Sequence, residues 1–161
     1  MDLDAPLSVA ELDAEADSLT LDRFDHETTW RIGVLLRDRA AAAGHPVAID
    51  IRRATGAILF RAALPGATAD QEHWLAGKSA LAFRFESSSA LVTARLAEAG
   101  AQAAAAAGWL PAGEYALSGG AVPFRVTGAG VVAVVTVSGL SGEADHRFAA
   151  QAIRDVRDGR A

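Results

Sequence analysis

The sequence lacks cysteine altogether, and it contains one methionine and one lysine among 161 residues. Without cysteine the chain can form no disulfide scaffold, thiolate nucleophile, cysteine-bound iron–sulfur cluster or covalently attached c-type haem. The first residues also lack the basic region and the continuous apolar run of a signal peptide or transmembrane helix. We therefore expect a cytoplasmic protein with no membrane partner.

Hydrophobic residues make up 51% of the chain and charged residues 22%, which is typical of one compact domain with a buried core. The charge is uneven, because residues 1–27 hold nine acidic residues against Arg23 alone. All the remaining basic residues except Lys78 are arginines, and they form no dense run with aromatic residues. This pattern argues against nucleic-acid binding. We expect residues 1–20 to be an acidic, flexible or loosely docked arm and residues 21–161 to form a single domain.

The hydrophobic pattern predicts an α+β fold. Apolar residues at helical spacing, with Asp25, Ser141 and either Thr68 or Asp70 as N-caps, indicate helices over 26–43, 71–83, 91–107 and 143–158. Alternating or β-branched runs indicate strands over 47–53, 57–63, 114–118, 121–127 and 131–138. The order α-β-β-α-α-β-β-β-α predicts a mostly antiparallel, five-stranded sheet covered by helices.

Motifs of several large enzyme classes are missing. The sequence has no G-x-x-x-x-G-K-[ST], H-E-x-x-H or G-x-S-x-G pattern. Residues 128–133 match the letters of a dinucleotide-binding fingerprint, but they open a predicted strand instead of a helix, so we interpret them as a turn. The histidines are scattered without the i, i+3 or i, i+4 spacing of a local metal site, and we expect no metal centre. They are His26, His45, His73 and His146.

Three groups of polar or glycine residues near the ends of predicted elements are candidates for ligand binding. Trp74 and Lys78 lie four residues apart on one helix, and Arg84 lies where that helix ends, so they can grip a flat anionic ligand. Alternatively, Trp74 is a core or interface residue that the two cations cover. The Gly119-Gly120 pair permits either a close backbone approach or a simple hairpin turn.

The third candidate group is the Asp145-His146 pair, in the first turn of the last predicted helix and directly after the central strand. Pockets often open at this place in sheet-based folds. An aspartate-capped turn explains the pair equally well.

Segments 59–89, 114–126 and 130–153 resemble the haem-degrading-domain family, whose relatives include HbpS, GlcG and the C-terminal domains of PduO. The resemblance covers about residues 20–158. It implies a profilin-like α-β-α fold and assembly into homo-oligomers, and some relatives bind or degrade haem. The residues that carry it are Pro65-Gly66, Asp70, Trp74, Lys78, Arg84-Phe85, Ser87-Ser88, Gly119-Gly120, Pro123, Val137-Ser138-Gly139-Leu140 and Asp145-His146.

The chain departs from the family pattern at two positions. Ser118 stands where the family usually has a histidine before the two glycines, and Gln71 stands where it has an asparagine. A serine cannot bind haem iron as an imidazole does. If haem binds through iron, His146 is then the ligand, or the protein supplies none.

These observations lead to three hypotheses. The first is an oligomeric module that binds a small anionic planar molecule, with haem as one possible cofactor. The second is a haem-degrading enzyme in which His146 is the axial ligand or proton donor and Asp145 fixes its tautomer. The third is a structural or chaperone-associated scaffold with Trp74 as an interface anchor. The candidate ligand-binding residues are Trp74, Lys78, Arg84, Ser118, Gly119, Gly120, Asp145 and His146.

Overall fold

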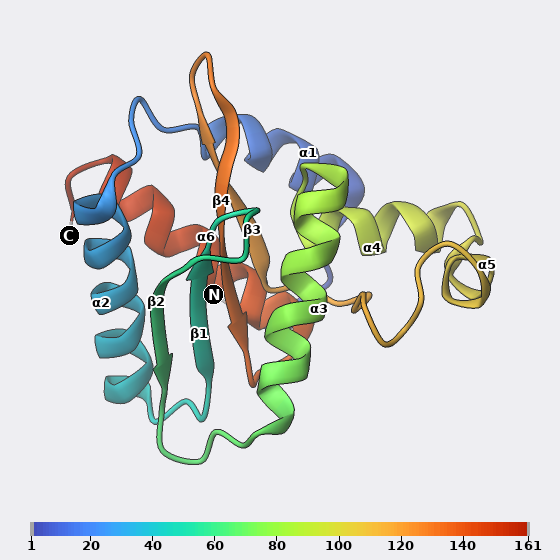
Figure 1. Cartoon of the computed structure of the whole chain (residues 1–161), viewed down its shortest axis with the longest axis horizontal. Coiled ribbons are helices and arrows are strands. Elements are labelled where there is room, and N and C mark those ends of the chain that lie inside the picture. Colours follow the sequence, from blue (N-terminus) through green and yellow to red (C-terminus); the bar gives the residue numbers. More distant parts are fainter. Residues whose placement is uncertain (1, 161) are drawn as a thin grey trace.

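The computed structural model describes residues 2–160, which form six helices and four strands (Figure 1). None of these helices combines the length and the apolar character needed to cross a membrane. In chain order the elements are α1 (Val9–Ser18), α2 (His26–Ala43), β1 (Ala48–Arg52), β2 (Ile58–Ala63), α3 (Asp70–Phe85), α4 (Ser89–Glu98), α5 (Gln102–Ala107), β3 (Ala121–Val126), β4 (Gly130–Ser138) and α6 (Gly142–Arg157).

The strands form one antiparallel sheet in the order β2-β1-β4-β3. The α+β prediction is thus confirmed, but the prediction of five strands is wrong, because residues 114–118 form no strand. Tyr115 and Leu117 instead pack against a small cluster around Leu81 and Leu110. The alternating apolar side chains of this segment therefore pack into that cluster and do not belong to a strand of the sheet.

Two helical segments differ from the prediction. The helix expected over 91–107 is two helices, since α4 ends at Glu98 and Gly100 adopts a positive φ of 62° before α5 begins. The acidic arm contains α1, which the sequence analysis did not predict. Ser8 and Glu11 form a reciprocal capping box at its start. The proposed caps of α3 are also wrong, because its N-cap is Ala69, which makes no side-chain hydrogen bond.

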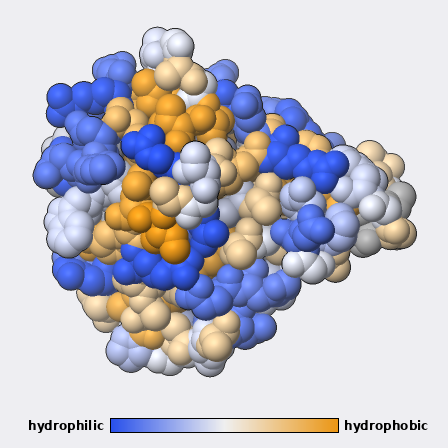
Figure 2. All heavy atoms as spheres, in the orientation of Figure 1, coloured by the Kyte–Doolittle hydropathy of each residue, from blue (hydrophilic) through white to orange (hydrophobic). Residues whose placement is uncertain are grey.

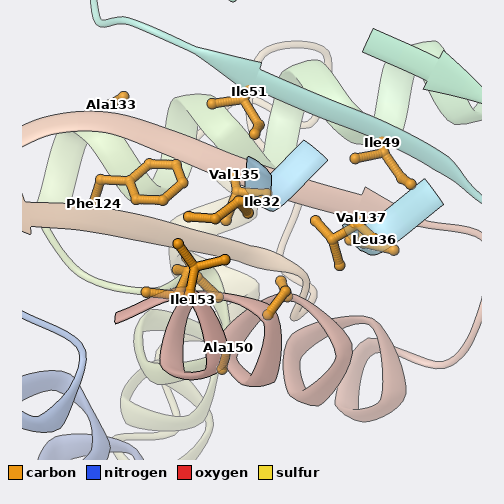
Figure 3. Close-up of a cluster of buried hydrophobic side chains, with 14 of the residues drawn as sticks. Ile32, Leu36, Ile49, Ile51, Phe124, Ala133, Val135, Val137, Ala150 and Ile153 are labelled. Carbon is orange, nitrogen blue, oxygen red and sulfur yellow. The ribbon is translucent and has the colours of Figure 1, made fainter. Parts of the chain in front are cut away.

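Helices cover both faces of the sheet, with α2 and α6 on one face and α3 on the other (Figure 1). The main core lies between the sheet and the α2–α6 pair. There Ile49 of β1 and Val135 of β4 point toward Ile32 of α2 and Ile153 of α6 (Figure 3). All four side chains are fully buried, so this face supplies most of the hydrophobic stabilisation.

The α3 face of the sheet is different, because several of its inward side chains are polar. Thr136 of β4 and Ser79 of α3 are buried, and their hydroxyl oxygens lie 2.7 Å apart. Asp50 of β1 is fully buried and forms ion pairs with Arg52, at the end of the same strand, and with Arg61 of β2. Strand alternation sends Asp50 to this face and its neighbours Ile49 and Ile51 to the other.

The two edges of the sheet also differ. At the β3 edge, Leu21 donates a backbone hydrogen bond to Arg125 and accepts one from Thr127, and Pro123 has no N–H to offer. At the β2 edge the described residues place no further strand. Two large apolar side chains near that edge, Trp30 and Ile58, are 60% and 51% exposed. Figure 2 shows hydrophobic residues gathered over the strands beside α3.

Candidate functional site

A pocket opens between the first turns of α3 and the loops that follow β4 and precede β3. Trp74 and Lys78 lie one helical turn apart on α3, as the sequence predicted, and both line it. The indole of Trp74 is 39% exposed and donates a hydrogen bond of 3.0 Å to Asp70. We call this cavity of about 240 Å³ the Trp74–Lys78 pocket. Its lining residues are Thr68, Asp70, Gln71, Trp74, Lys78, Ser118, Ser138, Gly139 and Leu140.

Lys78 ends in a buried ion pair. Its Nζ lies 2.8 Å from Oδ2 of Asp145 and donates to the carbonyl oxygen of Val137 at 3.3 Å. The other carboxylate oxygen of Asp145 accepts the backbone N–H of Leu140 at 3.1 Å. Burial raises the pKa of Asp145, and this effect outweighs the opposing charge of Lys78. The floor of the pocket therefore holds the Lys78 cation, with the fully buried Asp145 carboxylate directly behind it.

The Gly119-Gly120 loop makes the close approach that the sequence suggested. A Cβ at Gly119 would lie 2.3 Å from the carbonyl oxygen of Gly142. A Cβ at Gly120 would lie 2.4 Å from the carbonyl oxygen of Val137 and 2.9 Å from Nζ of Lys78, at a φ of +127°. Any side chain at Gly120 would displace the Lys78 ammonium, so this glycine is needed to keep the ion pair.

Arg84 does not join the pocket. It lies two turns farther along α3, is exposed, and donates a hydrogen bond of 2.6 Å to the carbonyl oxygen of Trp109. Its guanidinium lies over the rings of Trp109 and Tyr115, at 5.3 and 5.1 Å from their centroids. Arg84 is thus engaged in cation–π contacts with these rings and does not face the pocket. These contacts hold the segment that follows α5 against the end of α3.

His146 follows Asp145 in sequence, yet its side chain lies elsewhere. It is fully buried beneath α1, and its Nε2 is hydrogen-bonded to Glu15, which also pairs with Arg154. Burial raises the pKa of Glu15, but the hydrogen bonds and charges of His146 and Arg154 together lower it below the usual value. Asp145 therefore bonds Lys78 and Leu140, while Glu15 is the carboxylate that orients His146.

A second cavity lies on the other side of Trp74, and the sequence analysis did not identify it. This His73–Tyr115 pocket has a volume of about 350 Å³ and a mostly apolar lining. Its existence depends on the irregular path of residues 110–117, which includes most of the strand predicted over 114–118. It is lined by His73, Trp74, Leu110, Ala112, Tyr115, Ala116 and Leu117.

Some residues of the Trp74–Lys78 pocket were also missed as site residues. Ser138 and Gly139 belong to the segment that carries the family resemblance, and their position at the end of β4 was an available signal. Gln71 was noted only as a departure from the family pattern. Its amide donates to the carbonyl oxygen of Pro46 at 3.1 Å, which ties the rim of the pocket to the segment before β1.

Comparisons with known proteins identify relatives over most of the chain. A family model described as "Haem degrading protein HbpS-like" matches residues 24–154. A UPF0303 protein of Acidobacterium capsulatum is 40% identical over 145 residues, which is 90% of this chain and 87% of that protein. A UPF0303 protein of Streptomyces avermitilis is 41% identical over 148 residues, with 92% and 90% covered.

Solved structures show the same fold. The crystal structure of Ybr137w protein is 25% identical and has a TM-score of 0.86, covering 97% of this chain and 91% of that one. A structure titled as a PduOC:Heme complex is 22% identical with a TM-score of 0.64, covering 81% and 92%. At this identity the second likeness concerns the fold alone.

Proposed function

The chain belongs to the HbpS-like family, and from this premise we propose that it binds a small polar molecule in the Trp74–Lys78 pocket. The observation that carries the proposal is the buried Lys78–Asp145 ion pair at the floor of a cavity with an indole on its wall. Desolvating two charges is costly, so a pair retained beside a cavity favours a functional role over a purely structural one.

The lining indicates the chemistry of the ligand. Hydroxyl and amide groups come from Ser118, Ser138 and Gln71, while Trp74 offers a flat apolar surface. The charge of Lys78 is offset by Asp145, and Asp70 lies on the rim. A carboxylate therefore gains little here, and we expect hydroxyl or carbonyl groups to bind more tightly than the anionic groups that the sequence suggested.

A ligand-observed NMR screen of small polyols, hydroxy acids, aldehydes and ketones tests this proposal. We expect some of these compounds to bind, and we expect their binding signals to disappear in the Trp74→Ala variant. The Trp109→Ala variant should keep them, because Trp109 is similarly exposed but lies outside the pocket. Binding that is equal in the two variants would place the ligand elsewhere on the protein.

Haem is a second candidate ligand, which the description of the family favours. Iron ligands in haem proteins are imidazole, thiolate, thioether or phenolate groups, and the Trp74–Lys78 pocket is lined by none of them. The His73–Tyr115 pocket fits better, because it combines an apolar lining with an imidazole, a phenol and the Trp74 ring. His73 would then hold the iron there, and haem would supply the redox chemistry.

Titration with haemin, followed by its absorption spectrum, tests whether haem binds and whether His73 holds the iron. We expect a sharpened Soret band that is lost with His73→Ala and kept with His26→Ala, which removes an exposed histidine far from the pocket. Loss of the band after addition of ascorbate and oxygen, with release of iron, would favour the haem-degrading enzyme. An unchanged spectrum for His73→Ala would eliminate this pocket as the haem site.

We propose further that the chain forms a homo-oligomer through its β2 edge. An unpaired strand edge offers hydrogen bonds that a second copy can complete, and the exposed Trp30 and Ile58 add apolar surface beside it. Light scattering after size-exclusion chromatography tests this. Ile58→Lys should reduce the mass of the assembly, whereas Trp109→Ala should leave it unchanged; an unchanged mass for Ile58→Lys would contradict this placement.

A further inference from the structure

We propose that Lys78 forms an imine with the carbonyl group of a small aldehyde or ketone held in the Trp74–Lys78 pocket, and that Asp145 carries the proton for this step. The inference rests on the proposed function of this pocket and specifies its ligand as a carbonyl compound. Three features of the chain support it.

The first feature is the identity of residue 78. Lys78 is the one lysine among 15 basic residues, and the other 14 are arginines. Arginine remains protonated in proteins and cannot act as a nucleophile, whereas a lysine amine can. A chain that uses arginine at every other basic position thus has its single amine side chain at the floor of a pocket.

The second feature is the surroundings of Nζ. The side chain of Lys78 is 3% exposed, with Asp145 at 2.8 Å and the carbonyl oxygen of Val137 at 3.3 Å. These two acceptors engage two of the three ammonium protons. A Cβ at Gly120 would lie 2.9 Å from Nζ, so the bare glycine backbone packs directly against the ammonium. The amine is therefore held in one position beside the cavity, as a nucleophile requires.

The third feature is the acid beside it. Burial raises the pKa of Asp145, so its carboxylate is a stronger base than an exposed aspartate. Burying a charged group is costly. Moving one proton from Lys78 to Asp145 neutralises both groups and so removes two buried charges at once. An amine and a carboxylic acid in contact are the pair that imine formation uses.

The reaction balances with water as its other product. Lys78 gives a proton to Asp145, and the free amine attacks the carbonyl carbon. The new C–N bond forms as the carbonyl oxygen becomes a hydroxyl with a proton from the nitrogen. Asp145 then returns its proton to that hydroxyl, the C–O bond breaks, and water leaves. The nitrogen lone pair completes the C=N bond, which leaves a protonated imine beside the Asp145 carboxylate.

Reductive trapping tests the inference with an internal standard. Arg37→Lys introduces an ordinary lysine at an exposed position, since the Arg37 side chain is 49% exposed and distant from the pocket. The variant is treated with dilute glycolaldehyde and cyanoborohydride, and peptide mass spectrometry follows alkylation at both positions. We expect Lys78 to react about tenfold faster or more, because positioned acid–base catalysis contributes at least that much. A rate at Lys78 no greater than at position 37 would overturn the inference, because a merely structural buried pair reacts slowly.

Two variants in the same background examine the mechanism. Asp145→Asn should lower the rate at Lys78 by about tenfold or more, with no change at position 37. Because this change also removes a buried charge, Trp74→Ala provides a second test at a partly exposed position: it should slow Lys78 alone. Equal rates in the Trp74→Ala and parent proteins would count against reaction within the pocket.

The outcome for the imine can be separated from that for the pocket. Ethylene glycol is the alcohol that corresponds to glycolaldehyde and has no carbonyl group. If ethylene glycol or another polyol binds in a Trp74-dependent way and Lys78 is not trapped, the proposed function stands and the imine is rejected. If neither binding nor trapping depends on Trp74, both proposals fail.

Discussion

The two faces of the sheet are built from the same strands but have different content. On the α2–α6 face, Ile49, Val135 and Val137 are fully buried in an apolar core. On the α3 face, the alternate residues Asp50, Thr136 and Ser138 are also buried, yet they are polar. One face therefore stabilises the fold by hydrophobic burial, and the other holds buried polar groups, of which Ser138 also lines the Trp74–Lys78 pocket.

This difference indicates that the α3 face gives up some folding stability, and we attribute that loss to the proposed function of the pocket. Buried polar groups add little net stability even when they are paired, whereas apolar groups of the same shape would add more. A face selected for stability alone would repeat the pattern of the α2–α6 face. The following substitutions test that contrast, from the largest expected effect to the smallest.

Ile49→Ala should cause the largest loss, because it leaves a cavity in the apolar face. We expect the free energy of unfolding to fall by roughly 2–5 kcal/mol, measured by urea denaturation. Arg37→Ala is the surface control, since the Arg37 side chain is 49% exposed and should change it by less than about 1 kcal/mol. Equal losses in the two variants would show that the apolar face is not the main source of stability.

Asp50→Ala tests the polar face. It removes the common partner of Arg52 and Arg61, which are themselves partly exposed and can be rehydrated. We expect a loss of about 2 kcal/mol. Glu72→Gln removes the exposed partner of Arg61 instead and should cost less than about 1 kcal/mol. A loss for Asp50→Ala as large as that for Ile49→Ala would remove the contrast between the faces.

Thr136→Val replaces a hydroxyl of the polar face by a methyl group of similar size. It breaks the 2.7 Å hydrogen bond to Ser79 and leaves that serine without this partner, so we expect a loss of about 1 kcal/mol. The double variant with Ser79→Ala should recover part of this loss, because no unpaired hydroxyl remains. Thermal unfolding of the two single variants and the double variant measures the coupling.

Glu15→Gln concerns a polar contact outside both faces, where α1 meets α6. The pKa of Glu15 is lowered in the folded protein, so its ionised form contributes stability above the unfolded value of 4.5, and this is lost as the pH falls through the lowered pKa. We expect a loss of about 1 kcal/mol or less at pH 7. Urea denaturation at pH 7 and pH 3.5 should show the difference between parent and variant shrinking at the lower pH.

Most of the fold could be predicted from local pattern. Asp25 and Ser141 cap their helices as expected, and the four observed strands lie within a residue or two of their predicted bounds. The failures come from competing tertiary contacts. Residues 114–118 alternate like a strand but pack on the Leu81 cluster, and Gly100 interrupts an alanine-rich run that favours helix. The Ser8–Glu11 capping box was present in the sequence and could have identified α1.

The site could be predicted only in part. Helical spacing put Trp74 and Lys78 on one face of a helix, and both line the same pocket. The glycine pair suggested, as one of two alternatives, a close approach of the backbone, which the structure shows. Sequence proximity failed for Asp145 and His146, because adjacent residues on a helix point about 100° apart and here reach different neighbours. No local signal could pair Lys78 with Asp145, since 67 positions separate them and only the folded sheet brings them together.

The unequal edges of the sheet limit how the chain can associate. Leu21 and Pro123 obstruct the β3 side, while the β2 side remains available for strand pairing. Joining two copies through β2 consumes the available edge of both, so this mode of association closes on itself as a twofold pair. A sheet open at both sides can add copies indefinitely and grow into a fibre, whereas the proposed pairing through β2 would stop after a single addition.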